Sequence, residues 1–268
     1  MPSTDTQFPE KIDAILLAGG SIKNLPASEP KVPGKGHMLV GSLPMAARAL
    51  KAMRESERIN NIYLVTETSL EALGHEWEGV TETVKPGAKL IDSCCAGLAA
   101  PKNQNAPTLI VAGDLPFLTR TAIDDFIERC SKRPESSFWY GFLSRTNSEK
   151  KYPGLRHTWA KIDGEKCCGT GLSAIRPTVV PKIRATMHDI TQARKNPLKI
   201  ANILGWKTIF HFIIGKLTSK EAEAAMLKIL GISCAGINTP YAEAAYNVDD
   251  YESLLTARDM AEKEKQQN

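Results

Sequence analysis

The sequence lacks the long apolar runs of a membrane protein. No stretch reaches the roughly 18 to 20 consecutive apolar residues that a membrane-spanning helix requires. The apolar run near the start, residues 12–18, is interrupted by Asp13 and follows Glu10 and Lys11. A secretory signal needs a longer apolar stretch behind a basic leader. We therefore expect a cytoplasmic protein with no membrane partner.

A strong excess of charge of one sign is also missing. Lys and Arg number 34 and Asp and Glu number 30, which gives a net charge of +4. This balance is too weak to indicate a nucleic-acid partner, although it suits a small anionic ligand. The six cysteines include no C-x-x-C pair, so they indicate no zinc site. We expect them to be buried free thiols in a reducing cytosol.

Internal repeats and low-complexity linkers are absent too, so nothing in the chain marks a domain boundary. The 268 residues are 42% hydrophobic and 24% charged, which is ordinary for a globular protein. A chain of this size can bury a full hydrophobic core. We therefore expect one domain spanning residues 1–268.

Short apolar runs alternate with helical stretches in the first half of the chain. Strands are predicted at 13–18, 61–65 and 107–112, and helices at 44–54, 91–100 and 121–130. Continuous apolar strands separated by helices are typical of a three-layer α/β fold, in which helices cover both faces of a mostly parallel, twisted, Rossmann-like sheet. The second half reads as an α+β extension of that sheet, with strands at 137–142 and 158–162 and helices at 178–204, 218–230 and 249–264.

The first predicted strand ends in two glycines, Gly19 and Gly20. Open parallel sheets bind ligands beyond the carboxyl ends of their strands. Glycines there let the backbone approach a ligand closely and present N–H groups to anionic oxygens. The following loop supplies Lys23, Lys31 and Lys35. Neither a P-loop motif nor G-x-G-x-x-G is present, so an ordinary turn with solvated lysines stays open as an alternative.

The third predicted strand ends in a carboxylate, Asp114. A carboxylate at a buried strand end is costly unless it is paired, capped or bound to a cation. Mg²⁺ prefers one or two carboxylates together with phosphate oxygens and water. Asp249, just before the last predicted helix, is a candidate for the second carboxylate. The alternatives are that Asp114 is a turn residue and that Asp249 or Asp250 caps the helix.

Six segments occur in the order typical of one superfamily: residues 17–20, 35–45, 90–98, 113–118, 169–172 and 247–254. They resemble the motifs L-A-G-G, K-x-x-L-x-x-x-G-x-P-M, S-V-x-x-G-L, G-D-x-P-x-L, a glycine-rich stretch and N-V-D-T-P-E-D-L. On these motifs the chain is identified as a member of the MobA-like NTP transferase superfamily. The superfamily includes molybdenum-cofactor guanylyltransferases, sugar-phosphate nucleotidylyltransferases and methylerythritol-phosphate cytidylyltransferases.

The resemblance implies a fold of the nucleotide-diphospho-sugar transferase type, with a nucleotide-binding half at 1–135 and an acceptor-binding half at 136–268. It implies Mg²⁺-dependent transfer of an NMP group from an NTP to a small phosphorylated acceptor, with release of pyrophosphate. The implied catalytic residues are Lys35, Asp114 and Asp249, and the two aspartates are the implied metal ligands. The implied binding residues are Leu17, Ala18, Gly19, Gly20, Lys23, Ser93 and Gly113 for the nucleotide, and Gly169, Thr170 and Gly171 for the acceptor.

Two positions of the opening loop depart from the family pattern. Ile22 and Asn24 stand where the family has a small residue and an Arg, and Lys23 replaces the planar guanidinium fork with a point charge. A nucleotide-binding regulatory protein without transfer activity therefore stays an alternative. A nucleotide-sugar glycosyltransferase fits less well, because no D-x-D motif follows the third strand. Guanine or cytosine nucleotides and a homodimer are further expectations.

Three other features are assigned ordinary structural roles. The basic stretch 145–157 reads as a solvated loop rather than a grip for an acceptor phosphate. The segment 194–223, with Trp206 and the apolar run 210–214, reads as a packed core helix rather than as a pocket wall or a dimer face. The five histidines, including His37, are expected at the surface or at helix caps.

Overall fold

One continuous sheet runs through both halves of the chain in the computed structural model, which describes residues 7–193 and 206–267. Its path of paired strands is β10-β7-β9-β6-β1-β4-β5, and β8 pairs with β9 outside this path. The strands are β1 (Ile12–Leu17), β4 (Ile59–Val65), β5 (Glu82–Val84), β6 (Thr108–Ala112), β7 (Phe138–Ser144), β8 (Ala160–Ile162), β9 (Glu165–Ile175) and β10 (Cys234–Asn238). A separate hairpin joins β2 (Leu39–Val40) to β3 (Leu43–Pro44).

Strand β9 is the one that reverses direction in the path. It is antiparallel to both β6 and β7, whereas β1 pairs in parallel with β4 and β6, β4 with β5, and β7 with β10. The carboxyl ends of β1, β4 and β6 therefore lie along one edge of the sheet. This mostly parallel mixed sheet confirms the predicted fold class.

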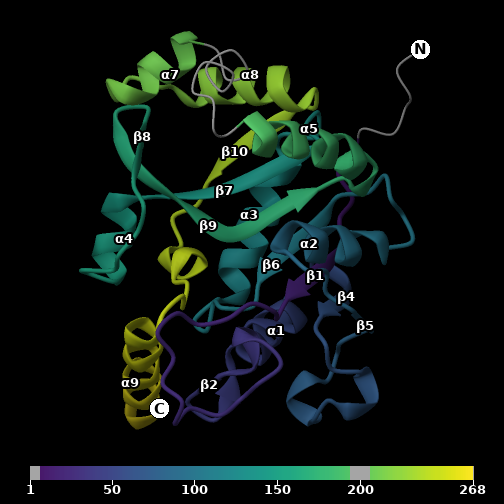
Figure 1. The fold of residues 1–268 in the computed structure, drawn as a ribbon, viewed down its shortest axis with the longest axis vertical. Coiled ribbons are helices and arrows are strands. Elements are labelled where there is room, and N and C mark those ends of the chain that lie inside the picture. Colours follow the sequence, from purple (N-terminus) through teal and green to yellow (C-terminus); the bar gives the residue numbers. More distant parts are fainter. Residues whose placement is uncertain (1–6, 194–205, 268) are drawn as a thin grey trace.

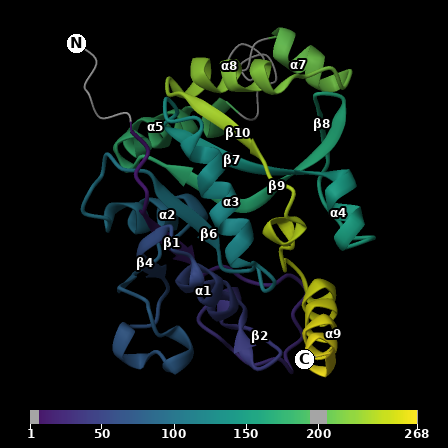
Figure 2. The ribbon, with the colours of Figure 1, turned by 180° about the vertical axis from the view of Figure 1, so that it is seen from behind.

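Helices cover both faces of the sheet (Figures 1 and 2). Alternate side chains of β1 point to opposite faces, as they must in a strand. Ala14 and Leu16 belong to the core beneath α1 (Met45–Glu55) and α3 (Arg120–Ser131). Ile15 and Leu17 belong to the core beneath α2 (Leu90–Ala99) and α5 (Val180–Ala193). A strand buried on both faces needs the continuous apolar run that the sequence shows.

The last helix, α9 (Tyr251–Gln267), packs against the β2–β3 hairpin rather than against the sheet. Leu254, Ala257 and Ala261 lie in one buried cluster with Met38 and Met45. The guanidinium of Arg258 donates to both carboxylate oxygens of Glu29 at 2.7 and 2.9 Å, and its Nε donates to the Leu39 carbonyl. These contacts hold the segment before α9 beside the opening loop.

Several elements differ from the prediction. β5, β9 and β10 were not expected, and the glycine-rich stretch 169–172 lies inside β9. Of the predicted helix 178–204, the part up to Ala193 is formed, and residues 194–204 lie outside the described ranges. Within those ranges, no helix is both long and apolar enough to span a bilayer.

The prediction that the apolar run 210–214 is core was wrong. Phe210 and Ile213 are 59% and 74% exposed, on α7 (Trp206–Ile213). Figure 1 places α7 and α8 (Ser219–Leu230) at the opposite end of the molecule from α9. This run therefore does not form a wall beside the segment that carries Asp249.

Candidate active site

The ammonium of Lys35 contacts two carboxylates that come from distant parts of the chain. Its Nζ pairs with Asp114, which follows β6, and lies 2.7 Å from Oδ1 of Asp249, which precedes α9. The side chain of Asp114 is 6% exposed and that of Asp249 is 63% exposed, so the cluster reaches from the interior to the surface. The structure thus brings together all three residues that the resemblance implied as catalytic.

Close backbone packing holds Lys35 at the end of β1. Lys35 opens a short 3-10 helix, η1 (Lys35–His37), and its N–H donates to the Gly20 carbonyl at 2.9 Å. The Gly36 N–H donates to the Ala18 carbonyl, and a Cβ on Gly36 would lie 2.8 Å from the Ala18 Cα. A Cβ on Gly34 would also clash with the backbone of this turn, at Ala18 and Gly19. Sequence reasoning missed these two glycines, although a glycine on either side of the predicted lysine was a readable signal.

The two carboxylates keep Lys35 charged. Burial by itself lowers the pKa of an ammonium, but attraction to Asp114 and the hydrogen bonds that Lys35 donates to both carboxylates outweigh it. The pKa of Lys35 is therefore raised above its ordinary value. A lysine cation fixed at this edge can bind an anionic ligand.

Asp114 is oriented by the segment that carries Asp249. The amide Nδ2 of Asn247 donates to Oδ1 of Asp114 at 3.1 Å, and the Val248 N–H donates to the Asp114 carbonyl. Asn247 is thus a site residue that sequence reasoning included in a motif but gave no role of its own.

The opening loop pairs with the same segment through the backbone of Lys23. The Lys23 N–H donates to the Asp249 carbonyl at 3.0 Å, and the Lys23 carbonyl accepts from Tyr251. Ile22 is buried beneath α9, whereas Asn24 adopts a left-handed φ of 56°. Of the two departures from the family pattern, Ile22 therefore anchors the loop against α9, and Asn24 lets the loop change direction beside the site.

Of the two glycines after β1, Gly19 faces open space and Gly20 adopts a left-handed φ of 84° beside the Lys35 side chain. Gly113 lies behind this turn, where its N–H donates to the Leu17 carbonyl at 2.9 Å. Ala18 is fully buried. The open part of the turn is therefore Gly19 and Gly20, and Leu17, Ala18 and Gly113 form the packed part beneath it.

His37 is half-buried and caps no helix, so the prediction of a surface or capping position was wrong for this residue. Its Nε2 lies 2.9 Å from the Thr66 hydroxyl, and its ring packs on Trp77 with centroids 4.8 Å apart. Burial lowers the pKa of His37, against an opposing attraction from Glu76. The His37 ring therefore holds η1 against the carboxyl end of β4, and this contact helps to fix the position of Lys35.

The other residues implied as binding residues lie in α2 and β9. The Ser93 hydroxyl accepts from the Gly87 N–H at 3.1 Å and so fixes the loop before α2. Gly171, in β9, packs beside β6, since a Cβ there would lie 2.7 Å from the Leu115 side chain. Gly169 and Thr170 precede it in the same strand.

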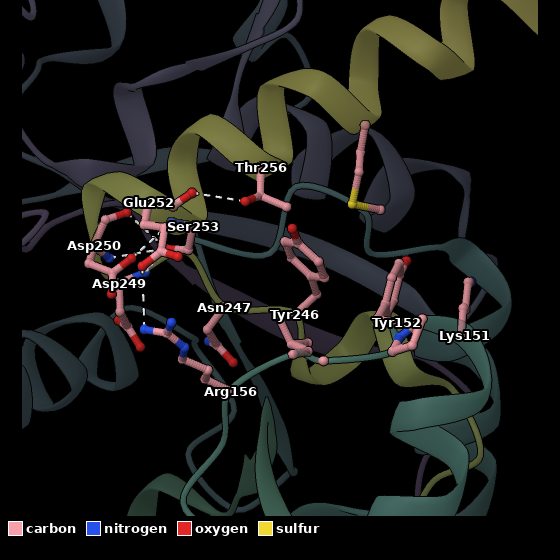
Figure 3. A pocket seen from close by; sticks show the side chains of 14 residues that line it. Lys151, Tyr152, Arg156, Tyr246, Asn247, Asp249, Asp250, Glu252, Ser253 and Thr256 are labelled. Carbon is pink, nitrogen blue, oxygen red and sulfur yellow. Dashed lines mark hydrogen bonds and ion pairs between the residues drawn. The ribbon is translucent and has the colours of Figure 1, made fainter.

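A pocket of about 360 Å³ opens beside Asp249 (Figure 3). One wall is the loop 151–156, the second is the segment from Tyr246 to Asp250, and the third is one face of α9. The basic stretch 145–157 was predicted to be a solvated loop, which is wrong for its first half, because helix α4 (Arg145–Lys151) forms there. Lys151 and Arg156 of this stretch line the pocket. Lys151 pairs at 2.8 Å with the buried carboxylate of Glu243.

The donor set at the centre fits Mg²⁺. Asp114 and Asp249 offer hard carboxylate oxygens that converge on one cation, the Lys35 ammonium. Among the described residues, no group of three or more His, Cys, Asp or Glu side chains is arranged to hold a metal. An ion held by two carboxylates that completes its shell with phosphate oxygens and water is the mode that Mg²⁺ prefers.

Known structures share this fold over nearly the whole chain. A hypothetical transferase from Thermus thermophilus is 24% identical, with a TM-score of 0.74 over 91% of this chain and 99% of that chain. CMP:2-keto-3-deoxy-manno-octonic acid synthetase, in complex with CTP, is 12% identical, with a TM-score of 0.59 over 96% and 100% of the two chains. The chain therefore shares its overall fold with these two proteins.

Sequence comparison gives the family. Residues 14–185 match the model of the MobA-like NTP transferase domain, and the chain belongs to this family. A 91-residue segment is 34% identical to 2-C-methyl-D-erythritol 4-phosphate cytidylyltransferase from Lachnospira eligens. That segment covers 32% of this chain and 38% of the relative.

Proposed function

We propose that this protein transfers a nucleotidyl group from an NTP to a small phosphorylated acceptor and releases pyrophosphate. The observation that carries the proposal is the convergence of Lys35, Asp114 and Asp249 at the carboxyl edge of the sheet, beside the glycine turn. In open α/β sheets this edge is where ligands bind. Family membership and the fold support the same reaction class.

The reaction needs little proton transfer from the protein. A phosphate monoester, with a second pKa near 6, is already largely a dianion at pH 7 and needs no strong general base. One of its oxygens attacks the α-phosphorus in line and forms the new P–O bond. The bond between the α-phosphorus and the bridging oxygen breaks, and pyrophosphate leaves with the electron pair.

In this proposal Lys35 stabilises the negative charge that grows on the phosphates. Its raised pKa keeps the ammonium charged at neutral pH. Asp114 and Asp249 would hold Mg²⁺, which when bound neutralises charge on the α-phosphate. Asn247 keeps the Asp114 carboxylate oriented.

The remaining binding roles follow from position. The N–H groups of Gly19 and Gly20 bind phosphate oxygens at the open side of the turn, and the exposed side chain of Lys23 adds charge nearby. Ser93 acts on the base or ribose through the loop that its hydroxyl fixes. Gly169, Thr170 and Gly171 form the acceptor side next to the end of β6.

The test is a pyrophosphate-release screen of four NTPs against a panel of phosphorylated small molecules, with Mg²⁺ and with EDTA. CTP comes first in the screen, because the 34% identical relative is named as a cytidylyltransferase. We expect release that depends on both an acceptor and Mg²⁺. We expect Asp249→Asn to abolish it, and Asp259→Asn, an exposed aspartate further along α9, to retain it. Nucleotide binding without release for any acceptor would refute the transfer activity and favour a regulatory protein.

The proposal extends to the assembly and location. We propose a homodimer in the cytoplasm. Static light scattering of the purified protein tests the first part, and a mass of 29.3 kDa would contradict it. Cell fractionation tests the second part.

A further inference from the structure

The pocket beside Asp249 changes in polarity along its length. Glu252, Thr256 and Met260 line it at spacings of four residues, so they form one stripe along α9. At 1.5 Å per residue this stripe is roughly 12 Å long. It runs from a carboxylate through a hydroxyl to a thioether as it leaves Asp249. The wall is therefore charged near Lys35 and apolar at its far end.

The opposite wall has the same gradient. Arg156 and Asn247 line the pocket near Asp249, whereas Tyr152 lines it at the end away from Asp249 (Figure 3). Lys151 lies beside Tyr152 at this far end, but its ammonium is already paired with the buried carboxylate of Glu243. Tyr152 packs on Tyr246 with ring centroids 4.9 Å apart. Tyr246 belongs to the buried cluster under α9, and Tyr152 and Met260 are partly buried and pack against that cluster. Burying methylene groups against such a wall is favourable, whereas a polyol would lose hydrogen bonds to water there.

One residue that lines the pocket, Tyr246, has a buried hydroxyl. Tyr246 is 2% exposed, and its hydroxyl makes no hydrogen bond within the described part of the chain. In Figure 3 this hydroxyl points toward α9 near Thr256. Because this oxygen is itself buried, it offers the pocket no polar contact, and only the apolar ring of Tyr246 lines the wall.

At the charged end of the pocket, the ion pair between Arg156 and Glu252 can be broken with little loss of stability. Arg156 pairs with Glu252 at 3.3 Å, and both side chains are largely exposed. Such exposed pairs contribute little to stability. A phosphate accepts two parallel hydrogen bonds from a guanidinium and can replace Glu252 as the partner of Arg156. The Asp250 carboxylate is already used, since it caps α9 by accepting from the Ser253 N–H at 2.9 Å.

We propose that this pocket binds the acceptor and that the acceptor is an elongated amphiphile: a phosphate monoester of a mainly apolar alcohol, rather than a sugar phosphate or other polyol phosphate. The inference rests on the proposed function. The phosphate lies between Arg156 and Lys35, and the carbon body extends along α9 toward Met260. One phosphate oxygen forms a bond to the α-phosphorus of the NTP, pyrophosphate leaves, and the product is a nucleoside diphosphate ester of the alcohol.

The test uses a homologous series with the full-length protein. Pyrophosphate release is measured with butyl, pentyl and hexyl phosphate, and with glycerol 3-phosphate and 2-C-methyl-D-erythritol 4-phosphate as polyol counterparts. We expect kcat/KM to rise about fourfold per methylene, which is the gain expected for burying one such group. The polyol phosphates should fall below butyl phosphate. Polyol phosphates that turn over well, with a flat alkyl series, would overturn the inference and leave the proposed function standing.

Variants locate the effect in the pocket. Met260→Gln keeps the side-chain length but makes the far end of the pocket polar. In this variant kcat/KM should therefore become nearly independent of the number of methylenes in the acceptor. Leu255→Gln, at an exposed site on α9 outside the pocket, should keep the wild-type dependence. If Met260→Gln does not fold, Thr256→Leu at an exposed position should steepen the series instead. An unchanged series in the folded variants would place the apolar body elsewhere and overturn the inference.

Direct binding separates the two proposals. Isothermal titration with hexyl phosphate, in Mg²⁺ and without NTP, should show binding that Met260→Gln weakens. Such binding without pyrophosphate release from any NTP would support the pocket and refute the transfer activity. Neither binding nor release with the alkyl phosphates would overturn the inference.

Discussion

Lys35 Nζ lies 2.7 Å from the Asp249 carboxylate, although 214 residues separate the two in the chain. The same nitrogen pairs with Asp114, so residues from the start, middle and end of the sequence meet at one point. Two carboxylates this close together would repel each other without a cation between them.

Removal of the Lys35 charge should affect the chemical step. We expect Lys35→Ala to lower kcat for pyrophosphate release by about two to three orders of magnitude, as for other losses of a charge contact to a transition state. The measurement is steady-state kinetics with the best NTP and acceptor pair. Lys220→Ala, at an exposed site on α8, is the control and should keep the wild-type rate. An unchanged kcat in Lys35→Ala would move the role to Lys23 or Lys31.

Gly36 and Gly19 should respond differently to the same substitution. Gly36→Ala forces a Cβ to within 2.8 Å of the Ala18 backbone, and overpacking of this kind costs about 1–3 kcal/mol of unfolding free energy. Gly19→Ala meets nothing within 4 Å. Its melting temperature should stay at the wild-type value, while its KM for the NTP rises because the Cβ stands where phosphate approaches. Thermal melts and kinetics of both variants check this pair, and a stable Gly36→Ala would contradict the packing.

Acid should destabilise the protein through His37. Burial lowers the pKa of His37 in the folded state, so the unfolded chain, with a pKa near 6.5, binds more protons below that pH. The His37 contribution to stability is therefore fully present above about pH 6.5 and declines as the pH falls through this value. Denaturation at pH 7.5 and 5.5 should show a smaller loss of unfolding free energy for His37→Gln than for the wild type. His75→Gln, at a fully exposed histidine, should keep the wild-type loss. Equal losses in all three proteins would contradict this role.

The sequence correctly predicted the elements in which the apolar residues follow one clear pattern. β1 and β6 are short apolar runs that end in glycine, and both occur where expected. β9 was missed because Gly169 and Gly171 interrupt its pattern, although its pairing with two neighbours stabilises it. The exposed face of α7 was misjudged because apolar composition alone does not say which side chains find a partner.

The sequence predicted which residues form the site, but it did not predict the contacts that hold them in place. Motif order pointed to Lys35, Asp114 and Asp249, which do converge. The supporting contacts depend on tertiary packing that no local pattern encodes. Examples are the half-buried ring of His37 beside Thr66 and the amide of Asn247 on Asp114.

The most direct test of the central claim is a double-mutant cycle on pyrophosphate release with Asp114→Asn, Asp249→Asn and the double variant. If both carboxylates act on one cation, either substitution alone removes most of the function, and the double variant should be about as slow as the slower single variant. Losses that simply multiply in the double variant would show two independent sites and would contradict the account.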